Sequence, residues 1–156
     1  MSDANIGVIG VGNPLRGDDG VGISVLEELR ERGVGEELEL IDGGTGGISL
    51  LHHLNRFRKV LMVDAIFFGG KCGEIHLFQL SDLKDEAIRI STHESGILDV
   101  LNLSKSLGEL PEVYVLGIQP EDVSFRTGLS EGIDVGAIAD RACGVIDKLT
   151  DLDADI

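Results

Sequence analysis

The run KVLMVDAI, residues 59–66, is the feature that most constrains the fold of this chain. It is almost continuously apolar and rich in β-branched residues, which is typical of a strand buried on both faces. Runs at 6–12 and 112–119 share this pattern, and a further strand is predicted at 37–42. Because a sheet buried on both faces needs helices on both sides, these runs predict a mostly parallel sheet in an α/β protein.

Amphipathic segments lie between the predicted strands. Helices are predicted at about 20–32, 48–55 and 91–107, the last opening with the capping-box pattern Ser91-Thr92-His93-Glu94. A closing helix is predicted from an apolar stripe at spacings of three and four residues, which comprises Val135, Ile138, Ala142, Val145 and Leu149. The alternation of strands and helices indicates a mostly parallel sheet with helices on both faces.

The segment GEIHLFQL, residues 73–80, alternates apolar and polar side chains and predicts one antiparallel strand, paired near the strand at 59–66. The expected fold class is therefore α/β: a three-layer α/β/α arrangement around a five-stranded, mostly parallel sheet with one antiparallel strand. A length of 156 residues suits a single domain, 1–156, with a tail at 151–156 that is expected to fray.

The charge of the chain excludes some classes of partner. It carries 28 acidic and 13 basic residues, a formal charge of −15, and only 4% aromatic residues. Nucleic acids and anionic membrane surfaces should be repelled, so we expect neither as a partner.

The N-terminal segment shows no basic region followed by an apolar leader and no long apolar segment, so we expect a cytoplasmic protein.

Acidic side chains follow several predicted strands at the point where each strand ends. Asp18 and Asp19 come after the first strand, Asp42 ends the second and Asp64 ends the third. Parallel sheets bind ligands beyond the carboxyl ends of their strands, so these acids should meet at one solvent-exposed edge. His93, in the first turn of its predicted helix, should enter from the same edge, as should Asn13 and the segment Gln119-Pro120-Glu121 after the last strand.

These residue types indicate a metal site and not a nucleotide site. Carboxylates with one imidazole form a ligand set for a borderline divalent ion. The pattern G-x-G-x-x-G fails because Leu15 stands where the third glycine belongs. Asp18 and Asp19 occupy the positions that Lys and Ser/Thr hold in a phosphate loop, and two carboxylates would repel phosphate.

The chain contains five motifs that together resemble the hydrogenase maturation proteases. The first two are GVGNPLRGDDGVG at 10–22 and IDGGTGG at 41–47; MVDAI at 62–66, THE at 92–94 and GIQPE at 117–121 follow in order. The resemblance covers nearly the whole chain and implies a twisted five-stranded sheet between helix layers. One departure is the segment DVSFRTGLS at 122–130, where relatives are more apolar; we expect it to contact the partner protein.

The resemblance implies a role for four residues. Asp19, Asp64 and His93 are similar to the metal-contacting positions of the family, and Asp42 matches an acid tied to substrate recognition or catalysis. These four are our candidate catalytic residues. Because we expect Asp19, Asp64 and His93 at a wet edge, replacing each by alanine should abolish activity and cost about 1 kcal/mol of stability or less.

The implied activity is removal of the C-terminal extension of a nickel–iron hydrogenase large-subunit precursor once nickel is installed. The implied metal is nickel carried by the substrate, so we expect the protein to hold no permanent metal. We also expect a monomer. A site with three ligands also fits a catalytic zinc, and the same ligands fit a non-catalytic nickel chaperone or checkpoint. A third alternative is a small-molecule enzyme that uses the glycine-rich loops.

The remaining histidines and the cysteines are interpreted as structural. His52 and His53 lie on a predicted helix away from the predicted site, and His76 lies within a predicted strand. Cys72 and Cys143 are 71 residues apart in apolar surroundings, so we expect inert buried thiols and no disulfide.

Overall fold

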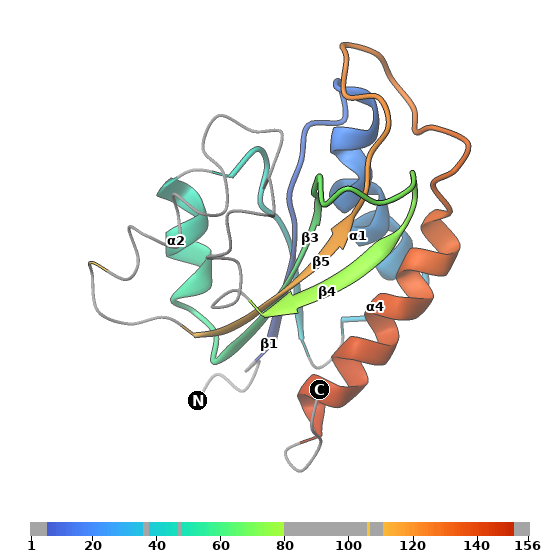
Figure 1. The fold of residues 1–156 in the computed structure, drawn as a ribbon. Helices are drawn as coiled ribbons and strands as arrows, with labels where there is room; N and C mark the ends of the chain where they lie inside the picture. Colours follow the sequence, from blue (N-terminus) through green and yellow to red (C-terminus); the bar gives the residue numbers. More distant parts are fainter. Residues whose placement is uncertain (1–5, 36–37, 47, 80–105, 107–110, 152–156) are drawn as a thin grey trace.

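The computed structural model describes residues 6–35, 38–46, 48–79, 106 and 111–151 (Figure 1). Its elements follow the order β1 Ile6–Gly10, η1 Gly17–Gly20, α1 Val21–Glu31, β2 Glu39–Asp42, α2 Ile48–Leu54, β3 Lys59–Ala65, β4 Ile75–Gln79, β5 Glu112–Ile118 and α4 Val135–Thr150. Each predicted strand and helix within these ranges is present, with ends that move by one or two residues. The predicted helix at 91–107 lies outside the described residues except for Ser106.

The five strands form one sheet in the order β2-β1-β3-β5-β4. Every neighbouring pair is parallel except β4 and β5, which are antiparallel. The fold class is therefore confirmed. The predicted partner of the antiparallel strand is wrong: β4 pairs with β5 and not near β3. The reason is that β1 and β5 already occupy the two edges of β3, so β5 offers the free edge.

Two hydrophobic cores lie on opposite faces of the sheet. Along β3, Leu61 and Val63 face one core, while Val60 and Met62 face the other. Buried residues of α1 and α4 complete the first core, and Leu50, Leu51 and Leu54 of α2 complete the second. Figure 1 shows α1 and α4 on one side of the sheet and α2 on the other, as the three-layer prediction requires.

The strand register fixes the edge where the acids lie. Gly10 is opposite both Asp42 and Val63, and Asp64 is opposite Gly117. The carboxyl ends of β1, β2, β3 and β5 therefore meet at one edge. The loops after β1 and β5 leave this edge and lie side by side beyond it (Figure 1).

Candidate active site

The loop after β1 folds tightly onto itself before α1 begins. Gly12 has a φ of +148°, and a Cβ atom there would lie 2.0 Å from the backbone oxygen of Asp19. Only glycine permits that approach. The turn of 3-10 helix, η1, then presents Asp18 and Asp19 in succession, and both side chains are fully buried.

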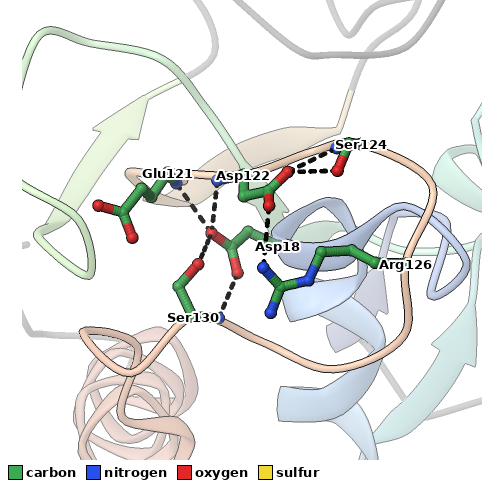
Figure 2. A network of polar contacts seen from close by, with 6 residues as sticks. All are labelled: Asp18, Glu121, Asp122, Ser124, Arg126 and Ser130. Atoms are coloured by element: carbon green, nitrogen blue, oxygen red, sulfur yellow. Dashed lines mark hydrogen bonds and ion pairs between the residues drawn. The ribbon is translucent and has the colours of Figure 1, made fainter.

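Asp18 joins this loop to the loop after β5. Its Oδ2 accepts hydrogen bonds from the backbone N–H groups of Glu121 and Asp122, both at 2.9 Å, and from the Ser130 hydroxyl at 2.7 Å (Figure 2). Its Oδ1 accepts from the Ser130 N–H at 2.7 Å. Burial alone would raise the pKa of this carboxyl, but the four hydrogen bonds outweigh burial and lower the pKa below its ordinary value. Asp18 is therefore a buried carboxylate with its charge satisfied by the protein.

The backbones of the same two loops are also paired directly. The N–H of Gly17 donates to the carbonyl of Arg126 at 2.8 Å, and the N–H of Arg126 donates to the carbonyl of Leu15 at 3.0 Å. The N–H of Asp18 donates to the carbonyl of Asp122 at 2.8 Å. We refer to residues 13–20 and 121–130 as the paired loops.

Asp19 points into the molecule. Its Oδ2 accepts a hydrogen bond of 3.0 Å from the N–H of Asn13, so the carboxylate closes the loop that carries it. Asp19 and Asp64 are both expected from the sequence to be exposed to solvent, but both are 0% exposed. The prediction that they lie at a wet edge is wrong, because the packed loop and the first turn of α1 cover the strand ends.

The start of α1 lies directly on the end of β3, where Asp64 is the sixth residue. A Cβ atom on Gly22 would lie 2.2 Å from the carbonyl oxygen of Val63 and 2.4 Å from that of Val11. The absence of a side chain at this position thus lets η1 and α1 approach the strand that carries Asp64. Asp19 and Asp64 are consequently at the same edge of the sheet, as predicted.

Asp42 differs from the other two acids because it is exposed. It is the last residue of β2, and its Oδ1 accepts a hydrogen bond of 2.8 Å from the N–H of Gly44. The carbonyl of Gly44 in turn accepts from the N–H of Gly12 at 2.7 Å. The Asp42 turn, residues 42–46, therefore lies beside the loop after β1 while its carboxylate remains accessible.

The segment after β5 fixes a third connection. The side-chain oxygen of Gln119, which is buried, accepts hydrogen bonds from the N–H groups of Phe68 at 2.8 Å and Gly70 at 3.2 Å. The loop between β3 and β4 is thus held against the carboxyl end of β5. Pro120 is buried and Glu121 is exposed.

His93 lies outside the described residues, so the predicted set of three metal-contacting side chains is placed only for Asp19 and Asp64. Within residues 6–35, 38–46, 48–79, 106 and 111–151, no group of three His, Cys, Asp or Glu side chains is arranged to hold a metal ion. In the same ranges, no helix is long and apolar enough to cross a membrane.

The cysteines and the other histidines occupy positions outside this set. Cys72 and Cys143 are free and half-buried beside the first core. Burial raises the pKa of the Cys72 thiol, and the negative charges of Asp18 and Glu121 raise it further. His76 is exposed and stacks on Phe68 with ring centroids 4.2 Å apart.

Sequence reasoning placed Asp18 at the solvent-exposed edge and treated it as an obstacle to phosphate, but it missed that Asp18 is buried at the centre of the paired loops. It missed Ser130 altogether. Three of the four hydrogen bonds to Asp18 come from backbone N–H groups, which leave no mark in the sequence. The one available signal was a second acid beside Asp19 directly after a buried strand.

Comparison with known proteins decides the family. A family model described as hydrogenase maturation protease matches residues 23–145. The hydrogenase expression/formation protein HoxM of Cupriavidus necator is 31% identical over 141 residues, which are 85% of this chain and 67% of that protein. The hydrogenase 2 maturation protease of Escherichia coli is 30% identical over 135 residues, 81% of this chain and 80% of that protein.

The chain belongs to the hydrogenase maturation protease family. Solved structures agree with this assignment. The maturation protease HybD of Thermococcus kodakarensis is 29% identical, with a TM-score of 0.71 over 94% of this chain and 99% of that one. The endopeptidase HybD of Escherichia coli has a TM-score of 0.77 at 24% identity, over 92% and 93% of the two chains, and it supports the fold. As a hydrogenase maturation protease, this protein is a peptidase.

Proposed function

We propose that this hydrogenase maturation protease removes the C-terminal extension of a nickel–iron hydrogenase large-subunit precursor after nickel has been inserted. In this proposal Asp19, Asp64 and His93 recognise the nickel of the substrate. The supporting observation is that η1, the end of β2 and the end of β3 bring Asp19, Asp42 and Asp64 to one edge of the sheet. Carboxylates suit a divalent ion, and a site assembled from several strands suits recognition of a presented metal.

The difference in exposure supports a division of roles among the acids. Asp19 and Asp64 are buried, and Asp42 is exposed at the adjacent turn. Asp42 is therefore the acid most accessible to a peptide that approaches the edge. Hydrolysis adds the hydroxyl of a water to the scissile carbonyl carbon and a proton to the departing amine, and Asp42, the exposed acid, would act as the base that activates this water.

The decisive experiment is incubation of the protein with nickel-loaded and nickel-free large-subunit precursors, followed by mass spectrometry of the precursor's C-terminus. We expect shortening of the nickel-loaded precursor alone. Asp19→Asn, Asp64→Asn and His93→Ala should each abolish shortening. Asparagine is preferred to alanine at the two buried positions, because removing a buried carboxylate outright leaves a cavity and unfilled hydrogen bonds.

A second measurement addresses the metal of the enzyme itself. We propose that the protein carries no permanent metal, because a carboxylate-rich site with one imidazole retains zinc weakly. We also propose that it acts in the cytoplasm as a monomer. Metal analysis after mild chelation should find little bound metal, and added zinc should not replace nickel in the precursor. A stoichiometric zinc whose removal stops cleavage of nickel-loaded precursor would identify a conventional metalloprotease.

A further inference from the structure

Two large apolar side chains stand out into solvent on the paired loops. Leu15 is 62% exposed and Phe125 is 84% exposed, and they are the large apolar residues with exposed side chains in the part of the chain that the structure describes. They come from loops about 110 residues apart in the sequence that are joined side by side at residues 16 and 126. The fold thus gathers at one place what the sequence separates.

The backbone beneath these side chains is fixed. The Arg126 N–H donates to the Leu15 carbonyl, and four hydrogen bonds to Asp18 hold the two ends of the loop after β5, at residues 121–122 and 130 (Figure 2). The Arg16 guanidinium lies 5.7 Å from the centre of the Phe125 ring, and its Nε donates to the Val123 carbonyl at 3.2 Å. Because these loops are already ordered, they lose little conformational entropy when a partner binds, which favours binding.

The charge of this surface contrasts with that of the molecule. The chain has a formal charge of −15, yet Arg16 and Arg126 lie beside the two apolar side chains. Arg126 bonds to the Asp122 carboxylate at 2.8 Å, whereas Arg16 bonds to a backbone carbonyl and keeps its full positive charge. An apolar side chain flanked by a carboxylate is therefore the partner chemistry that this surface fits best.

We propose that Leu15, Arg16 and Phe125 form a docking surface for the body of the hydrogenase precursor. The inference rests on the proposed function and adds to it a contact away from the peptide that is cut. The surface continues directly into the loop of Asp18 and Asp19, so a precursor seated on it lies at the carboxyl edge of the sheet. Apolar anchors held on rigid loops carry much of the affinity in protein interfaces.

The test is steady-state cleavage of the nickel-loaded precursor by the full chain and by Leu15→Ser, Phe125→Ser and the double variant. We expect KM of the double variant to rise about tenfold while kcat falls no more than about twofold, because the contact serves association. Arg16→Gln should raise KM by a smaller factor that disappears at high salt. Thr127→Ala, an exposed change on the same loop, is the matched control and should leave KM unaltered.

The outcomes separate this inference from the function on which it rests. If the unaltered protein shortens no nickel-loaded precursor, the proposed function fails and the docking surface fails with it. If the unaltered protein shortens the precursor and the folded double variant has the same KM, only the docking surface is overturned. A fall in kcat with KM unchanged would also overturn it, since that result describes a role in the chemical step.

Discussion

The paired loops and the Asp42 turn lie at the same edge of the sheet but are held in different ways. In the paired loops, a buried carboxylate accepts four hydrogen bonds from residues 103 to 112 positions away. In the Asp42 turn, the carboxylate is exposed and bonds to a backbone N–H only two residues away. The difference teaches that two acids at the carboxyl ends of neighbouring strands can have opposite roles: Asp18 joins distant segments, and Asp42 faces solvent.

The largest expected effect follows from this contrast. Asp18→Ala should lower the free energy of unfolding by about 3 kcal/mol, because it leaves buried donors without their charged acceptor. Asp42→Ala should lower it by less than about 1 kcal/mol. Urea denaturation of both variants measures the difference. Equal losses would mean that the four hydrogen bonds to Asp18 contribute no more than a local turn.

Acid should weaken the paired loops through Asp18. Its pKa is lower in the folded protein than in the unfolded chain, so its contribution is complete above the unfolded value of about 3.8 and is lost as pH falls through the folded value. One proton changes stability by at most about 1.4 kcal/mol per pH unit. Asp18→Asn should therefore flatten the acid limb of the stability profile.

The flattening should be incomplete, because Asp122 titrates in the same region. Hydrogen bonds from Ser124 and Arg126 lower the pKa of Asp122 to about 2. Denaturant titrations from neutral pH to about pH 3 compare Asp18→Asn with the unaltered protein. Parallel curves would show that Asp18 has the same proton affinity in both states.

A smaller effect is expected from Ser130→Ala. This change removes the hydroxyl that donates to Asp18 but keeps the backbone N–H bond, so it should cost about 1 kcal/mol. Because the remaining three hydrogen bonds still hold the loop, cleavage of precursor should continue. Thermal melts beside the cleavage assay provide the measurement, and a loss as large as that of Asp18→Ala would place most of the stabilisation in one hydroxyl.

The smallest effect is expected at Cys72, which lies near the paired loops without taking part in their hydrogen bonds. Burial and the charges of Asp18 and Glu121 raise the pKa of its thiol, so it stays protonated at neutral pH. Iodoacetamide should label it slowly in the folded protein and rapidly in urea, and Cys72→Ser should cleave precursor at an unaltered rate. Rapid labelling of the folded protein would contradict the raised pKa.

The sequence predicted the elements and their common edge because buried strands and amphipathic helices leave periodic patterns. It could not predict the partner of β4, since alternation indicates orientation but not which neighbouring edge is free. Nor could it predict that Asp19 and Asp64 are buried, because the cover is supplied by the backbone of η1 and by Gly22. The role of His93 stays a prediction.

The long separation between Asp18 and Ser130 also bears on how the protein is made. All five strands are complete at residue 118, but Asp18 receives none of its four hydrogen bonds until residues 121–130 have been synthesised. Contacts between residues so far apart form slowly, and domains are translated from the N-terminus. A nascent chain that ends before residue 121 therefore contains the residues of all five strands, while the loop that carries Asp19 still lacks the contacts from residues 121–130 that fix its shape.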